Sequence, residues 1–132
     1  MWTGDIESAV FTRVKTAGNK AFKTKYRNIF YTTENETDNE AVFPTVYLQE
    51  LTGSERGRDL EGIEILAMLS SFQIDVSDND SKQRCKEVME NALATMKSLK
   101  YEIIGMPTYR KSNGVWLGTA RCRRVISKND IL

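Results

Sequence analysis

The sequence contains no histidine among its 132 residues. Histidine is the commonest general base, the usual partner in a catalytic triad and a frequent zinc ligand, so its absence removes these sites together. The sequence also lacks a glycine-rich phosphate loop and a nucleophile-elbow serine. A hydrolase with paired carboxylates stays open, because 18 acidic residues offer many pairings and no spacing singles one out. We expect a protein that is not an enzyme and binds no cofactor.

Cysteine is scarce, and the two that are present lie far apart, at Cys85 and Cys122. Two such thiols cannot build a structural zinc site, which needs four ligands. Each belongs to the apolar set of its own element, so in a reducing compartment both are expected to be small core residues. A disulfide between them is the alternative, because a helix and a strand can pack together.

No apolar run approaches the roughly 20 residues that span a membrane, and no signal-peptide pattern is present, so we expect no membrane partner. The formal net charge of +1 lacks the basic footprint of a dedicated nucleic-acid binder. The charge is nevertheless segregated, at +4 over residues 1–33, −6 over 34–62 and +3 over 63–132. This alternation suits contacts between copies of the chain, although solvated loops and helix faces would produce it equally well.

The most informative stretch is residues 63–76, reading IEILAMLSSFQIDV. Side chains of a strand alternate with period two, and here both alternate sets are apolar before Phe72, whereas only one set is apolar after it. This predicts a long strand that is buried on both faces at one end. A single domain of this length has little with which to cover a second face, so we expect another subunit to cover it.

Two stretches carry the three- and four-residue spacing of amphipathic helices. The first begins near Asp5 and ends near a breaker at Gly18-Asn19. The second runs from Ser81, a favourable N-cap, to Leu99.

Four further strands are expected, in addition to the central one. Their bounds are Ile29–Thr33, Thr45–Thr52, Tyr101–Thr108 and Val115–Ile126. Pro107 suggests an edge position or a strand end, and Asn113-Gly114 predicts a tight hairpin. The order is α-β-β-β-α-β-β, which indicates an α+β fold with an antiparallel-rich mixed sheet of four to five strands and two main helices packed on it. One domain would span 1–132, ending in a loose tail at 127–132.

Two connections attract attention. The segment 34–40, ENETDNE, holds four carboxylates, which either bind a cation or are simply solvated; the absence of a full calcium-loop pattern favours the second interpretation. The segment 53–62, GSERGRDLEG, is far longer than a tight hairpin loop. We interpret it as a projecting loop that docks on a partner.

One local basic patch is present. Its members are Arg110, Lys111, Arg121, Arg123, Arg124 and Lys128. It either contacts nucleic acid or phosphate, or forms an exposed strand face that pairs with the acidic loops of a neighbour, and we favour the second interpretation.

Three stretches, taken in chain order, resemble one protein family. They are IFYTTEN at 29–35 with FPTVYLQEL at 43–51, then GSERGRDLEG with the strand to FQIDVSDND, and finally GMPTYRKSNGVWLGTARCRRVI at 105–126. Together they are similar to the tail terminator, or tail completion, proteins of long, flexible-tailed bacteriophages. The resemblance spans nearly the whole chain from residue 29, and the first 28 residues match only in being a helix.

The resemblance implies an α+β subunit of a homohexameric ring at the head-proximal end of the virion tail, assembled in the host cytoplasm. Such rings stop polymerisation of the tail tube and provide the surface that joins tail to head. The implied partners are other copies of the chain, the major tail tube protein and a head-completion or connector protein, with DNA only as cargo through the lumen. The alternatives are a head-completion or connector ring protein and a small nucleic-acid-binding module.

Within such a ring we expect the 53–62 loop to bind the last tube ring or a neighbouring subunit. The two arginines of the last strand would face either a subunit interface or the lumen. The residues expected at these contacts are Ser54, Glu55, Arg56, Arg58, Asp59, Glu61, Arg121 and Arg123.

Overall fold

The structure is a computed structural model, and it describes residues 6–22, 29–33, 43–58 and 65–127. Side chains within residues 52–68 and that of Ser127 are outside this description. Over the described ranges two helices and five strands follow one another in the order α-β-β-β-α-β-β, so the expected α+β fold is confirmed. The elements are α1 (Ile6–Ala21), β1 (Phe30–Thr32), β2 (Thr45–Arg58), β3 (Ile65–Asp78), α2 (Lys82–Ser98), β4 (Glu102–Ser112) and β5 (Val115–Ser127).

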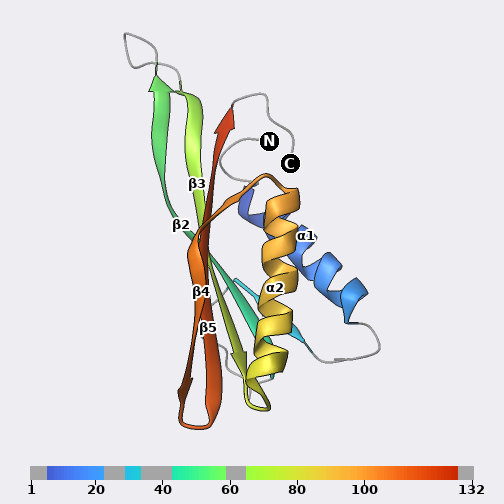
Figure 1. The fold of residues 1–132 in the computed structure, drawn as a ribbon. Coiled ribbons are helices and arrows are strands. Elements are labelled where there is room, and N and C mark those ends of the chain that lie inside the picture. Colours follow the sequence, from blue (N-terminus) through green and yellow to red (C-terminus); the bar gives the residue numbers. More distant parts are fainter. Residues whose placement is uncertain (1–5, 23–28, 34–42, 59–64, 128–132) are drawn as a thin grey trace.

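The strands form one mixed sheet in the spatial order β1-β2-β3-β5-β4. β1 is parallel to β2, and the other neighbours are antiparallel, so β1 and β4 are the two edges. Figure 1 shows both helices on the same face of this sheet. No helix of the described residues covers the opposite face, which is called the open face below.

The core lies between the helices and the sheet. Period-two alternation sends one set of side chains from β2, β3 and β5 toward the helices, and each large side chain buried there contributes roughly 1.5–3 kcal/mol. The set includes Val46, Leu48, Phe72, Ile74, Val76, Ala120 and Cys122, which pack on Val10 and Val14 of α1 and on Val88, Met89 and Met96 of α2. The predicted burial of one face from Phe72 onward is therefore confirmed. Burial of the other face at the start of β3 concerns side chains that lie outside the description.

The helix ends near Gly18-Asn19, as predicted, but these residues do not break it. Helix α1 continues two residues further to Ala21, and Gly18 is a buried residue inside it. A Cβ built at Gly18 would overlap the hydroxyl of Tyr31 on β1. Glycine therefore serves here to let a strand residue approach the helix backbone, a reason that only the folded chain reveals.

The predicted 53–62 loop is also largely wrong. β2 continues through Arg58, with its last pairs to β3 at Arg56↔Ala67 and Arg58↔Ile65. A register shift between Leu51 and Ser54 accommodates Thr52 and Gly53 as a bulge. Figure 1 shows this long β2–β3 hairpin reaching beyond the ends of the helices. The turn itself lies within 59–64, outside the described residues, as does most of the predicted tail at 127–132.

β4 is an edge strand, as Pro107 indicated, but it runs on to Ser112 rather than ending at Thr108. Its pairing with β5 shifts between Ile104 and Thr108, and Gly105 within this bulge has a φ of 73°. The predicted tight hairpin is confirmed: Asn113 and Gly114, with φ of 52° and 79°, form the two-residue turn between β4 and β5.

The predicted N-cap of α2 is confirmed as well. The Ser81 hydroxyl accepts a hydrogen bond from the backbone N–H of Arg84 at 3.1 Å. Buried Asp78, the last residue of β3, accepts from the Ser81 backbone N–H at 3.0 Å and from the Arg84 guanidinium, including Nε at 2.7 Å. This paired carboxylate fixes the tight connection between β3 and α2.

The Gly18–Tyr31 contact generates a prediction. Substitution Gly18→Ala should lower the free energy of unfolding by about 2 kcal/mol, because the added methyl overlaps the Tyr31 ring. Combined with Tyr31→Ala, it should cost less than the sum of the two single changes. Urea unfolding of the four variants measures this coupling. The exposed neighbour provides the control, since Asn19→Ala should change stability by about 0.5 kcal/mol or less. If the stability loss of the double variant equals the sum of the two single losses, the Gly18–Tyr31 contact is contradicted.

Candidate functional site

The open face carries a polar ladder across its two central strands. The Arg121 Nε donates a hydrogen bond to the Gln73 side-chain oxygen at 3.0 Å. The Gln73 amide in turn donates to Asp75 at 3.1 Å, and the Thr119 hydroxyl donates to the same carboxylate at 2.9 Å. These side chains come from alternate positions of β3 and β5 whose neighbours point into the core. Paired in this way, these four side chains make an ordered polar surface.

The predicted basic patch is split between the two faces of the sheet. Arg121 and Arg123 lie on the open face, as expected from alternation with buried Cys122. Arg123 is 3.6 Å from Glu102 in an exposed ion pair, which contributes little to stability. Arg124 points the opposite way, and its Nη1 donates to the Leu99 carbonyl at the C-cap of α2 at 3.0 Å. The prediction that Arg124 belongs with the other two is therefore wrong, because a shift of one residue reverses the face.

The remaining predicted contact residues belong to the long hairpin. Ser54, Glu55, Arg56 and Arg58 lie on β2, so they are strand residues rather than loop residues, and their side chains are outside the description. Asp59, Glu61 and Lys128 fall outside the described residues altogether, and so does the acidic segment 34–40. The strand register relates the hairpin residues to the arginines of β5. Ser54 pairs with Leu69 of β3, and Arg123 pairs with Ser71, two positions further along the same strand.

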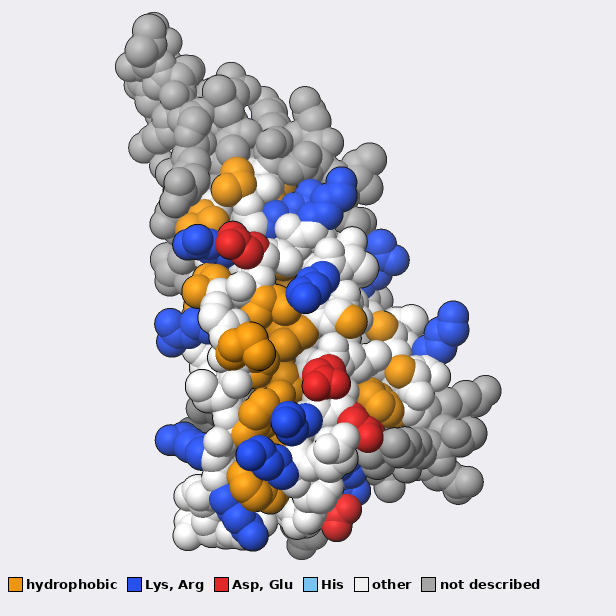
Figure 2. All heavy atoms as spheres, viewed as in Figure 1, with side chains coloured by type: hydrophobic (Ala, Val, Ile, Leu, Met, Phe, Trp, Pro, Cys, Tyr) orange, Lys and Arg blue, Asp and Glu red, His pale blue; other side chains and the backbone are white. Residues whose placement is uncertain are grey.

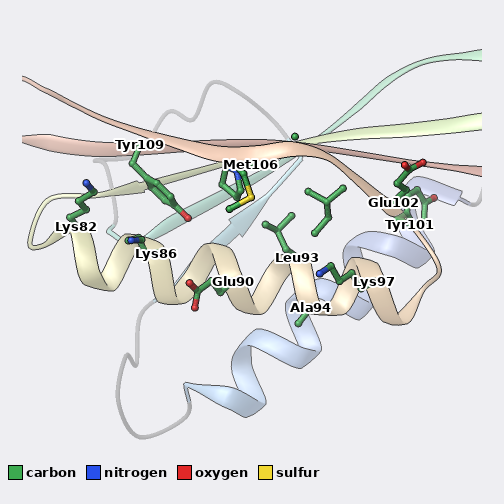
Figure 3. Close-up of a pocket in the computed structure, with 13 residues that line it drawn as sticks. Lys82, Lys86, Glu90, Leu93, Ala94, Lys97, Tyr101, Glu102, Met106 and Tyr109 are labelled. Atoms are coloured by element: carbon green, nitrogen blue, oxygen red, sulfur yellow. The ribbon is translucent and has the colours of Figure 1, made fainter.

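A groove between α2 and the edge strand β4 was not predicted. Its volume is about 820 Å³. Figure 3 shows Met106 and Tyr109 pointing from β4 toward the helix and Leu93 pointing from the helix toward the strand, with Lys86 and Lys97 lying along α2 on either side of Leu93. The full lining is Lys82, Lys86, Glu90, Leu93, Ala94, Lys97, Tyr101, Glu102, Ile103, Gly105, Met106, Pro107 and Tyr109.

The groove exists because β4 bulges. Between Ile104 and Thr108 the strand leaves its regular pairing with β5, and Met106 within this stretch is 87% exposed. Figure 2 shows a band of hydrophobic side chains running down the face in view, and exposed apolar patches often mark interaction sites. The sequence held a signal for the groove: Lys82, Lys86 and Lys97 recur at helical spacing beside the core stripe of α2.

Lysines rim the groove and its lower end. Lys86 lies over the Tyr109 ring at 5.8 Å, and Lys82 and Lys111 lie on Trp116 at 5.5 and 5.8 Å. Over the part of the chain that the structure describes, no carboxylate lies within ion-pairing distance of these lysines. The aromatic rings offset only part of their charge, which leaves the rest available to an anionic partner.

The two cysteines are free and buried, so the alternative of a disulfide is wrong. Burial raises the pKa of the Cys122 thiol from 9.0 to about 12. Burial, aided by the nearby Asp78 carboxylate, raises the pKa of Cys85 from 9.0 to about 11. Both thiols therefore stay protonated near neutrality, as core residues rather than nucleophiles.

Across residues 6–22, 29–33, 43–58 and 65–127, no group of three or more histidine, cysteine, aspartate or glutamate side chains is arranged to hold a metal ion. None of the helices in these ranges is long and apolar enough to cross a membrane. No family model matches the chain, and no curated protein matches it either.

The buried titratable groups generate a prediction about alkaline pH. Burial also raises the pKa of Tyr31 from 10.0 to about 12, so this phenol and both thiols keep their protons in the folded state longer than in the unfolded one. Stability should be constant up to about pH 9 and then fall toward pH 12, because the unfolded chain releases these protons first. Urea midpoints measured from pH 7 to 11 test this. Cys122→Ala should give a shallower decline, and a wild-type midpoint unchanged at pH 11 would contradict the burial.

Proposed function

We propose that this protein is a virion structural subunit that assembles into a ring, caps a phage tail tube, stops its polymerisation and offers the surface to which the head is joined. The observation that supports this best is the one-sided packing of the sheet. Both helices cover one face, while the open face presents an ordered polar ladder and both edge strands, β1 and β4, are free of a further strand among the described residues. A subunit of this shape has surfaces left for neighbours. The family resemblance of the sequence supplies the identity of the ring.

The open face suits either of the two positions proposed for Arg121 and Arg123. Facing a neighbouring copy, the arginines would meet acidic side chains; facing the lumen, they would line the passage of DNA. In both cases the ladder to Gln73 and Asp75 holds the Arg121 guanidinium in one orientation. A preorganised cation of this kind loses little side-chain entropy when a partner binds.

The β2–β3 hairpin is the proposed contact with the tube. It extends past the helices and is held by backbone pairing along its length, including Arg58↔Ile65. A two-stranded arm of this kind can dock rigidly on a matching ring. A cap terminates growth because it offers the tube one matching surface and no second surface for further tube subunits.

Charge reversal on the open face tests the ring. Arg121→Glu with Arg123→Glu should convert a ring into monomers if the arginines lie at a subunit interface, because two attractive contacts become repulsive. Native mass spectrometry of the purified protein measures the change. A ring that persists while joining of tails to heads fails places the arginines in the lumen. The matched control is Arg13→Glu with Lys20→Glu, at two exposed positions of α1. This variant should form an assembly with the same number of subunits as the wild type.

If the double arginine variant forms an intact ring and tails assemble normally, the two arginines act neither at a subunit interface nor in the lumen. Thermal melting followed by circular dichroism must first show that each variant is folded. Both arginines are exposed, so their loss should shift stability by about 0.5 kcal/mol or less.

Shortening the hairpin tests termination separately. Because Arg56 pairs with Ala67, replacing residues 57–66 by Asn-Gly should close the two strands with a tight turn in the same register. We expect rings of normal mass that no longer stop the tube, so that tails assembled in their presence are abnormally long by electron microscopy. Normal-length, head-joined tails would exclude the hairpin from termination. Tails of normal length that lack heads would favour a connector role.

A further inference from the structure

We propose that the groove between α2 and β4 is the receptor for the acidic segment 34–42, ENETDNEAV, of a neighbouring copy of this chain. This inference rests on the proposed ring function and assigns the contact that closes the ring. The occupant joins four carboxylates to a short apolar end formed by Ala41 and Val42. The groove offers the complementary pair of features, cations at the rim and apolar side chains below.

Charge is the first argument. The rim lysines Lys82, Lys86 and Lys97 line one side of the groove, and no ion pair engages them within the described ranges. Glu90 and Glu102 also line it, so three cations against two anions leave the lining net positive. Residues 34–62 carry a net charge of −6, and four of the carboxylates are concentrated in the seven residues 34–40. Like-signed or neutral segments of the chain would gain nothing at this rim. The acidic segment is the part of the sequence that matches it best.

The apolar floor is the second argument. Met106 is 87% exposed, and with Leu93, Ile103 and Pro107 it forms a surface that water covers poorly. A purely acidic peptide would leave this floor wet. The apolar residues that follow the acidic run would cover it, while the carboxylates meet the lysines at the rim.

Topology decides between a chain's own segment and that of a neighbour. Residues 34–42 connect β1 to β2, whereas the groove lies between α2 and β4, at the opposite edge of the sheet. The sheet is about 19 Å wide from β1 to β4. A nine-residue connection with both ends fixed extends at most about 17 Å. The segment therefore reaches the groove of another copy rather than its own.

Opposite edges also give the contact its geometry. Donor segment and acceptor groove are different patches on one subunit, so each copy can bind one neighbour and be bound by the next. Repetition of such a heterologous contact closes into a ring when the rotation permits, or otherwise forms an open filament.

A charge-swap experiment tests the proposal. One variant carries Lys82→Glu, Lys86→Glu and Lys97→Glu; a second carries Glu34→Lys, Glu36→Lys, Asp38→Lys and Glu40→Lys. Each alone should associate with itself at least about 30-fold more weakly than wild type, because attraction at the rim becomes repulsion. An equimolar mixture should restore assembly, since acidic grooves meet basic segments and basic grooves meet acidic ones. Native mass spectrometry resolves the alternating oligomer by mass.

The matched control reverses three exposed cations on α1, Arg13→Glu, Lys15→Glu and Lys20→Glu, and should assemble like wild type. A labelled peptide of residues 34–42 gives a second readout by fluorescence anisotropy. It should bind the variant with reversed segment charges, whose groove is intact, and should not bind the variant with reversed groove charges. A peptide with glutamines and asparagines in place of the acids should bind at least about tenfold more weakly.

The outcomes separate this proposal from the proposed function. A wild-type ring that both reversals leave intact overturns the groove contact while the ring remains. If the wild-type chain never associates but its groove binds the peptide, the groove is a receptor for the acidic segment, and the proposed ring is overturned. Absence of both association and peptide binding overturns both. Reversals that lower stability without changing mass would place the segment in its own groove and overturn the contact between copies.

Discussion

The structure depends on the alternation of side chains along its two central strands. In β3 and β5 every second residue is buried against the helices, with Phe72 and Ile74 facing Cys122 and Ala120 across the pair. Because both helices draw on this single set, they lie on one face, and the intervening residues must form the open face. The polar ladder and the placement of the arginines on the two faces both follow from that one arrangement.

The sequence carried enough information to predict the elements whose stabilising contacts are local. The apolar stripe and Ser81 cap predicted α2, the Asn113-Gly114 turn predicted the last hairpin, and Pro107 indicated an edge strand; each was confirmed. These signals succeed because the determining interactions span a few residues: a cap bonds three residues ahead, and a tight turn needs positive φ at two adjacent positions.

The predictions that failed concern residues whose conformation is decided by distant partners. Residues 53–58 are rich in glycine and charge, typical of a loop, yet they are strand because the first part of β3 supplies a backbone ladder. Gly18 looked like a helix breaker, yet its lack of a side chain accommodates Tyr31. The groove likewise lies beside the bulge in β4. Its shape depends on the spacing between this edge strand and α2, which no local sequence pattern specifies.

The same one-sided packing underlies the association between copies that we propose. One-sided packing satisfies the apolar residues of the interior but leaves two chemically different edges, a lysine-rimmed groove beside β4 and an acidic connection after β1. A contact between two identical edges would bring like charges together and would stop at a dimer. A contact between the two unlike edges would be electrostatically favourable. Each added copy would again present one unoccupied groove and one unbound acidic connection at the ends of the assembly. In the proposed assembly, only closure of the chain of contacts upon itself would satisfy all edges at once, and for this reason we propose a ring as its end state.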